Sequence, residues 1–242
     1  MIRVVLLCMA GLLAGCTGLQ TLNRASTPNS LYALTPKSTF SASLPRISQQ
    51  IVVEEPTASA AVNTDQIAVQ PTPLQVQYLP GARWVDRAPL IVQTLLIESY
   101  ENSNRVGAVG RSSVGLRADY VIVTDLREFH AYVPEGPDAN AALQVIVRLN
   151  VKIVEALDDK IIASQGFREI SPSESDAPFD LVTAYDEALG DAMRDAVEWS
   201  IRRISTHAAT KPPREEFSMD AAPPAAPTSG QIIPVAAQTP TL

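Results

Sequence analysis

Residues that could do chemistry are few in this chain and lie far apart in the sequence. There are two histidines, His130 and His207, and two cysteines, Cys8 and Cys16. A zinc site needs three or four nitrogen, sulfur or oxygen ligands around one point. Two scattered histidines with no free thiol beside them do not meet that need. The sequence predicts no metal site, and Cys16 is the residue to which it assigns a chemical role.

The acidic pairs and the glycines also lack the pattern of an active site. Glu54 and Glu55 are neighbours in an extended segment, so their side chains point to opposite faces and do not share a site. Asp158 and Asp159 are typical of a turn. The segment 107–111 has two glycines but neither the lysine nor the spacing of a phosphate-binding loop. We predict that the chain is not an enzyme and binds no cofactor.

The first 16 residues have the pattern of a secretion signal that ends at a cysteine. Arg3 supplies a positive charge, and the apolar run 4–14 is too short for a membrane-spanning helix, which needs about 20 residues. The run leads into Leu13-Ala14-Gly15-Cys16, which resembles the lipobox of bacterial lipoproteins. An ordinary signal peptide with an incidental cysteine, or an apolar helix of a cytosolic protein, would show part of the same pattern.

The lipobox resemblance implies that residues 1–15 are removed and that Cys16 then carries diacylglycerol and an N-linked acyl chain such as palmitate. Cys8 would leave with the signal, so the mature chain would hold no second thiol for a disulfide. Several acyl chains hold a protein to a bilayer stably, since each buried CH₂ contributes about 0.8 kcal/mol. Thr17 replaces the aspartate that retains many lipoproteins at the inner membrane. This favours the outer membrane and a periplasm-facing domain in the cell envelope.

Composition divides the rest of the chain. Of its 242 residues 46% are hydrophobic and 19% charged, so one substantial core can be buried. Residues 16–30 are predicted to be a flexible tether, residues 31–206 the folded domain, and residues 207–242, mostly Ala, Pro, Thr and Ser, a disordered tail. The net charge of −7 argues against nucleic acid as a partner and against broad electrostatic adhesion to anionic lipid.

Hydrophobic spacing predicts strands and two long helices within the domain. Residues 143–153 alternate apolar and polar side chains, as a strand covered on one face does. The alternation of residues 120–126 slips before Phe129, which indicates a bulge. The other expected elements are strands at 32–34, 51–55, 67–69, 74–78 and 161–170, an edge strand or loop at 105–111, a helix from 86 to 102–104, and a last helix at 179–205 with a small-residue face.

The first long helix is expected to begin just after Trp84. Asp86 is its predicted N-cap, and Pro89 fits its first turn. Trp84 is either a core anchor or part of a surface for a partner or a lipid. Arg83 and Arg87 flank it, and they either pair with carboxylates of a partner or solvate the start of the helix. These three residues are the candidate partner-binding residues.

Several segments together resemble one protein family by their order and spacing. They are residues 32–34, 83–89, 118–120, 126–129, 143–157 and 184–189, downstream of the lipobox. On these segments, residues 31–205 resemble the ABC-type transport auxiliary lipoproteins, a group that includes the PqiC-like lipoproteins. The resemblance implies an α+β fold with a mixed, mostly antiparallel sheet of about four main strands and two long helices packed on one face.

The same resemblance implies a function. Members of the family accompany MCE proteins, ABC permeases and their ATPases in lipid transport between bacterial membranes, without catalysis of their own. We therefore expect a membrane-anchored accessory component that docks on an MCE assembly, a role with which a homo-oligomer is compatible. Two alternatives stay open: a lipoprotein that assembles another envelope complex, and a periplasmic carrier module with its own lipid cavity. The small side chains of the last helix favour close packing over such a cavity.

Overall fold

The computed structural model describes residues 29–112, 117–134 and 143–211. The chain divides into two units, residues 1–210 and 211–242, and the fold below belongs to the first of them. The predicted signal peptide, Cys16, the tether up to residue 28 and the tail from residue 212 lie outside the described residues.

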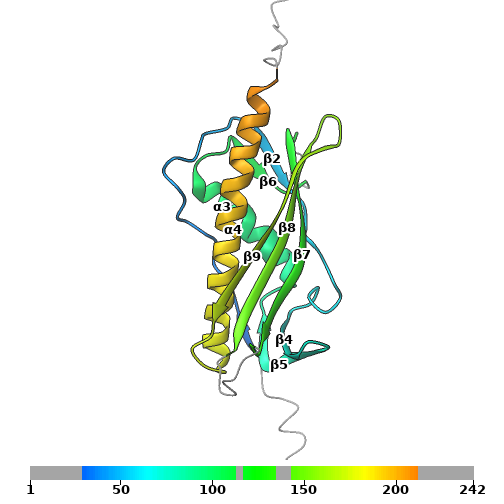
Figure 1. The fold of residues 1–242 in the computed structure, drawn as a ribbon, viewed down its shortest axis with the longest axis vertical. Coiled ribbons are helices and arrows are strands. Elements are labelled where there is room, and N and C mark those ends of the chain that lie inside the picture. Colours follow the sequence, from blue (N-terminus) through cyan, green and yellow to red (C-terminus); the bar gives the residue numbers. More distant parts are fainter. Residues whose placement is uncertain (1–28, 113–116, 135–142, 212–242) are drawn as a thin grey trace, which may run out of the picture. The chain divides into compact units, whose positions relative to one another are not determined.

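Nine strands and two helices occur in the described part of the chain, and the strands join in one sheet (Figure 1). The long strands are β5 (Gln75–Trp84), β7 (Tyr120–Tyr132), β8 (Gln144–Glu155) and β9 (Lys160–Pro172). The shorter strands are β1 (Ser30–Tyr32), β2 (Gln50–Val53), β3 (Thr57–Ala58), β4 (Gln66–Thr72) and β6 (Ala108–Gly110). The helices are α3 (Ala88–Ser103) and α4 (Pro178–Ala209).

Strand β7 is the centre of the sheet. One of its edges pairs antiparallel with β8, which pairs in turn with β9. Its other edge pairs in parallel with β2, β3 and β4 in succession, opposite Tyr120, Asp125 and Ala131. Beyond them, β6 extends β2, β5 extends β4, and β1 extends β5. The α+β class and the mixed sheet are confirmed, whereas the predicted number of about four strands is wrong.

The number of about four, which the family resemblance implies, matches the four long strands and leaves out the short ones. Strands β1, β2, β3 and β6 have two to four residues each. Hydrophobic spacing indicates β2 at 51–55, β1 at 32–34 and β6 within 105–111, whereas the two residues of β3 are too few to display the period of a strand. The short strands exist because longer neighbours offer unpaired edges, mainly that of β7. Antiparallel pairing is confined to the hairpins β4–β5 and β8–β9 and to the pair β7–β8.

The two longest adjacent strands follow the predicted pattern. On β8, Val147, Leu149, Val151 and Ile153 are buried, while the residues between them are partly exposed. The pairing of β7 with β8 shifts register between Leu126 and Glu128, which confirms the bulge before Phe129. The turn from β8 to β9 contains Asp159 with a positive φ of 52°, a conformation that aspartate tolerates better than most residues.

Helix α3 begins one residue later than expected. Its N-cap is Arg87, whose extended backbone precedes the helix, and no side chain caps it. The carboxylate of Asp86 instead accepts the backbone N–H of Arg87 at 2.7 Å. Pro89 lies in the first turn, as predicted. The helix ends at Asn104, which has a left-handed φ of 52° and donates its N–H to the carbonyl of Glu101.

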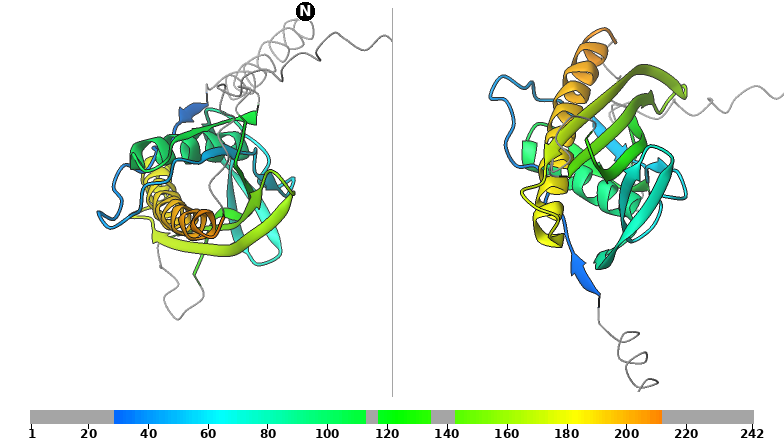
Figure 2. Two further views of the ribbon diagram at one scale, coloured as in Figure 1. Left: turned by 90° about the horizontal axis from the view of Figure 1, so that it is seen from above. Right: turned by 60° about the horizontal axis from the view of Figure 1, so that its bottom comes forward.

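Helix α4 lies along β8 and β9, and α3 lies beside it over the same core (Figures 1 and 2). Its predicted small-residue face is buried, which lets the helix approach the sheet closely: Leu181, Tyr185, Ala188, Ala192 and Ala196. The helix continues to Ala209 instead of ending at Ser205, so His207 is helical. Among the described residues, no helix combines the length and the apolar character needed to cross a bilayer.

Candidate functional site

Trp84 lies in the core, in a cluster of three aromatic rings. Its ring centroid is 5.8 Å from that of Phe129 and 5.1 Å from that of Tyr185, and those two centroids are 4.9 Å apart. The hydroxyl of Tyr185 donates to the carbonyl of Ala68 at 2.6 Å. Only 1% of Trp84 is exposed. The structure thus gives Trp84 the core role, and its side chain is not part of the surface that a partner can reach.

Arg83 and Arg87, the other two candidate partner-binding residues, are on the surface and pair with carboxylates of the same chain. The Nη1 of Arg83 lies 3.0 Å from Oδ2 of Asp65, and the Nη2 of Arg87 lies 2.9 Å from Oε1 of Glu55. The two arginine side chains remain 38% and 42% exposed. Both guanidinium groups can therefore meet a partner, but as parts of existing ion pairs.

The two histidines lie near opposite ends of β7, His130 on the strand itself and His207 on α4 beside Tyr120. His207 lies near the end of α4, and its Nδ1 is 2.9 Å from the hydroxyl of Tyr120. Burial raises the pKa of Tyr120, and the charge of Asp119 raises it further. His130 lies ten residues later on β7, and burial lowers its pKa against the opposing effect of Glu128. Within the described ranges, no three histidine, cysteine, aspartate or glutamate side chains are grouped to hold a metal ion.

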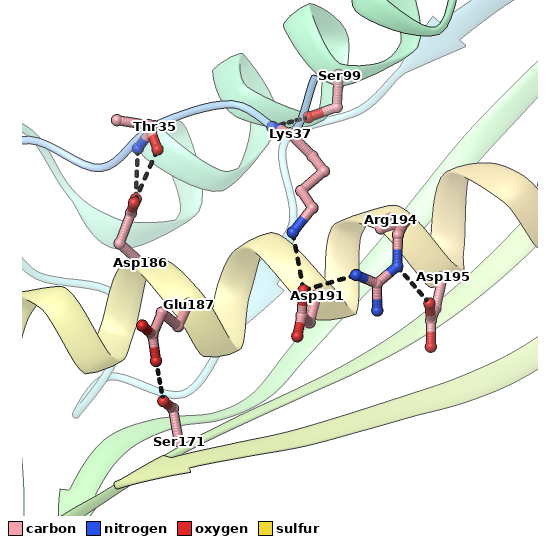
Figure 3. A network of polar contacts seen from close by, with 9 residues as sticks. All are labelled: Thr35, Lys37, Ser99, Ser171, Asp186, Glu187, Asp191, Arg194 and Asp195. Atoms are coloured by element: carbon pink, nitrogen blue, oxygen red, sulfur yellow. Dashed lines mark hydrogen bonds and ion pairs between the residues drawn. The ribbon is translucent and has the colours of Figure 1, made fainter. Parts of the chain in front are cut away.

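An extended segment, residues 33–49, runs beside both helices, and we call it the strap (Figure 3). Thr35 donates its backbone N–H and its hydroxyl to the two carboxylate oxygens of Asp186, at 2.6 and 2.8 Å. The Nζ of Lys37 lies 2.8 Å from Oδ1 of Asp191. The strap is therefore attached to the polar side of α4, while α4 presents its apolar side to the sheet.

The strap makes further hydrogen bonds to side chains farther along α4. The N–H of Ser41 donates to Oε1 of Glu198 at 2.6 Å, and Arg202 donates to the hydroxyl of Ser43 at 3.4 Å. From the first of these contacts to the last, the strap advances eight residues and α4 sixteen. This ratio is expected, because an extended chain rises about 3.3 Å per residue and a helix about 1.5 Å. From Thr35 to Ser43 the strap therefore runs in the same direction as α4.

Asp191 of α4 forms ion pairs with Lys37 of the strap and with Arg194 of the same helix. The hydrogen bond from Lys37 lowers the pKa of Asp191, and Arg194 lowers it further, against the effect of burial. Because the folded pKa is lowered, Asp191 stabilises the fold at neutral pH, and this contribution is lost as the pH falls through that pKa. Glu169 on β9 behaves oppositely, since burial and the charges of Asp195 and Asp191 raise its pKa.

The hairpin formed by β4 and β5 exposes apolar side chains. Between Asp65 and Arg83 lie 17 residues without a charged side chain, and we call this segment the apolar hairpin. At its turn Leu74 is 100% exposed, and Val76 and Tyr78 are 46% and 37% exposed. Exposed apolar side chains gathered in a segment without charge mark a candidate contact surface.

An open groove of about 440 Å³ lies where the apolar hairpin meets the outer face of the sheet. Its lining includes His130, Ile146 and Arg168 from the sheet and Pro71 and Pro73 from the hairpin. Ile146 is only 5% exposed although it points away from the main core. Apolar side chains are therefore combined with the cationic Arg168 and the anionic Glu128 in an open groove, which suits a segment of another molecule better than an enclosed ligand.

Sequence reasoning marked residues 67–69 and 74–78 as extended segments and assigned them no role. The signal that could have found the apolar hairpin is the absence of charge over 17 consecutive residues in a chain that is 19% charged. Cys16, the predicted lipidation site, lies outside the described residues.

Comparison with known proteins identifies the family. Residues 32–197 match the family described as the ABC-type transport auxiliary lipoprotein component. An uncharacterized protein of Bradyrhizobium diazoefficiens is 27% identical over 161 residues, which cover 65% of this chain and 41% of that relative. The chain thus spans about two fifths of that relative's length.

Solved structures share the fold. A crystal structure of a Xanthomonas campestris protein is 26% identical, with a TM-score of 0.70 over 75% of this chain and 99% of that one. A crystal structure of an uncharacterized protein has a TM-score of 0.54 at 11% identity, over 72% of this chain and 99% of that one. The family match covers more than half of the chain, including all strands from β2 to β9, and this chain belongs to the ABC-type transport auxiliary lipoprotein family.

Proposed function

We propose that the protein is a non-catalytic accessory lipoprotein of an MCE-type ABC transporter and supports lipid transport across the periplasm. The observation that carries this proposal is the family match over residues 32–197, whose description includes both the ABC transporter and the lipoprotein character. The MCE partner and the lipid cargo are the finer part of the proposal, and the resemblance of the segments from 32–34 to 184–189 supports them.

In this proposal the acyl chains on Cys16 hold the protein at a membrane. The segment Leu13-Ala14-Gly15-Cys16 supports the lipid attachment, and Thr17 favours the outer membrane. The domain acts by binding and positioning, with energy supplied by a separate ATPase. A rigid body suits this work, and the strap contributes by tying the segment after β1 to both helices through Thr35, Lys37 and Ser99.

Affinity purification of the tagged chain from bacterial membranes in mild detergent tests the proposal. We expect an MCE-domain protein and an ABC permease to be recovered with it. Recovery of neither, from membranes that contain both, would contradict the proposal. Recovery of polysaccharide or pilus assembly proteins in their place would support the alternative of an accessory to another envelope complex.

A second arm of the experiment tests the candidate partner contacts. Arg87→Glu should reduce recovery of the MCE partner if the guanidinium meets partner carboxylates. Arg127→Glu is the matched control, because Arg127 is similarly exposed (48%) and also pairs with a carboxylate at 2.9 Å, that of Asp125. Equal recovery with both variants would remove Arg87 from the proposed interface and leave the family-level proposal in place.

A further inference from the structure

The apolar hairpin carries no charge beyond its base. Asp65 and Arg83 form an ion pair at 3.0 Å at the two ends of the 17 uncharged residues. The tip exposes Leu74 completely and Val76 by about half. Transfer from water toward hydrocarbon is favourable for leucine and valine and unfavourable for charged side chains. This distribution therefore suits a segment whose tip meets the boundary of a bilayer while its base stays in water.

Strand β1 determines the side on which the described chain enters the domain. It pairs in parallel with the end of β5, with Ser30 opposite Ala82. Because β1 is parallel to the last three residues of β5, the backbone enters β1 at Ser30 from the side of Ala82 on which the rest of the hairpin lies. The chain that connects to Cys16 therefore enters the domain on the same side as the apolar hairpin.

The two lengths also agree. Six residue steps of β4, from Gln66 opposite Arg83 to Thr72 opposite Gln75, measure the length of the hairpin, and they span about 20 Å at the rise of a strand. Fourteen residue steps separate Cys16 from Ser30, and the flexible tether predicted for residues 16–30 would have a root-mean-square reach of about 20 Å. A bilayer that holds the lipid on Cys16 would thus lie close to the level of Leu74.

The distribution of charge in the chain also favours contact with a membrane at the tip of the hairpin. The chain has a net charge of −7, and an acidic surface is repelled by anionic headgroups within about one Debye length, roughly 8 Å at physiological salt. An uncharged hairpin longer than this distance allows contact at its tip while the ion pair of Asp65 and Arg83 and the acidic surface beyond it stay outside the repulsive layer.

We propose that the tip of the apolar hairpin, around Leu74 and Val76, enters the headgroup–acyl boundary of the membrane that holds the lipid on Cys16. This inference rests on the anchor in the proposed function and adds a second contact with the same lipid surface. Two contacts fix the orientation of the domain. The turn between β8 and β9, at the end of β7 that pairs Tyr120 with Glu155, then points away from the membrane.

Site-specific fluorescence on the full lipidated chain tests this contact. The mature chain has no cysteine other than the acylated Cys16, so a cysteine introduced by Leu74→Cys takes up a thiol-reactive, polarity-sensitive dye at one position. The matched control is Leu157→Cys, because Leu157 is also an apolar residue in a hairpin turn and is 74% exposed. Both are reconstituted in vesicles of phosphatidylethanolamine with a minority of phosphatidylglycerol.

We expect the dye at position 74 to shift its emission to shorter wavelength and to be quenched by nitroxide-labelled acyl chains, and the dye at position 157 to stay as in water. A water-like signal at position 74, or an equal shift at both positions, would overturn the inference. Palmitate labelling of the same preparations distinguishes failure of the hairpin contact from failure of the lipid anchor. A labelled chain with position 74 in water refutes the hairpin contact alone, whereas an unlabelled chain refutes the anchor and with it the inference.

Discussion

Gly107 lies where the end of the strap meets the segment that leads into β6. The N–H of Ile47 donates to the carbonyl of Arg105 at 2.8 Å, which brings the two backbones together. A Cβ atom on Gly107 would lie 2.4 Å from the carbonyl oxygen of Ser48 and 2.8 Å from its carbonyl carbon. Both are main-chain atoms, so they cannot move aside as a flexible side chain would.

Gly107→Ala should therefore lower the free energy of unfolding by about 1–3 kcal/mol, the usual cost of overpacking. Urea unfolding of the two chains measures the difference. Gly166→Ala is the matched control, because its Cβ would meet no atom closer than 3.9 Å. If Gly107→Ala were as stable as Gly166→Ala, the close approach of the strap to β6 would be wrong.

The role of Trp84 could not be predicted from the sequence. An aromatic side chain before a helix is compatible with a core and with a surface, and position 84 gave no means to decide. The decision comes from Phe129 and Tyr185, which are 45 and 101 residues away in the chain and surround Trp84 only in the fold. Cys16 is the opposite case, because its prediction depends on the three residues just before it.

At the scale of elements, the strap is held by side chains of α4 and has no pairing partner in the sheet. Its backbone N–H groups at Thr35 and Ser41 donate to the carboxylates of Asp186 and Glu198. Hydrogen bonds to ionised acceptors are stronger than those between neutral groups. The two carboxylates therefore protect the strap amides from exchange with solvent.

The double variant Asp186→Ala, Glu198→Ala should release the strap and raise deuterium uptake at residues 33–44, by a factor of several in initial rate. Hydrogen-exchange mass spectrometry of peptides from this segment measures the effect. Glu187→Ala is the control, because Glu187 is on the same helix but accepts a hydrogen bond from Ser171 of β9 (Figure 3). Unchanged uptake in the double variant would show that the remaining contacts hold the strap without these carboxylates: the buried Leu34, Leu44 and Ile47 and the bonds of Lys37 to Ser99 and Asp191.

Elements differ in how far the sequence predicts them. Strands β7 to β9 and both helices were predicted to within a few residues, since alternation or helical spacing persists over ten residues or more. The strap has neither period, because its contacts alternate between α3, α4 and the core. Strand β3, with two residues, is defined only by its register against Asp125 and Leu126 of β7.

At the scale of the whole molecule, anchoring and folding should be separable. Cys16 lies 14 residues before Ser30, where the first described strand begins. Cys16→Ser should therefore abolish incorporation of labelled palmitate and leave the thermal unfolding midpoint of the domain unchanged. Labelling that persists in the variant would contradict lipidation at this residue. A large loss of thermal stability would contradict the independence of the domain from its anchor.

Some properties of the whole molecule could be predicted from the sequence, and the orientation of the apolar hairpin could not. The lipobox pattern, the acidic net charge and the family follow from local segments and composition, and the family match bears out the last of these. The orientation of the hairpin relative to Ser30 could not be predicted, because it depends on the parallel pairing of β1 with β5, which joins residues about 52 positions apart.

That pairing also decides how the domain responds to tension. A pull on the chain before Ser30 acts along β1, so the hydrogen bonds of its three residues to β5 bear the load together, in shear, instead of opening one at a time. Once β1 yields, the load passes to the contacts of Thr35 and Lys37 with α4. Two points of mechanical resistance in series therefore separate a force on the N-terminal chain from the hydrophobic core.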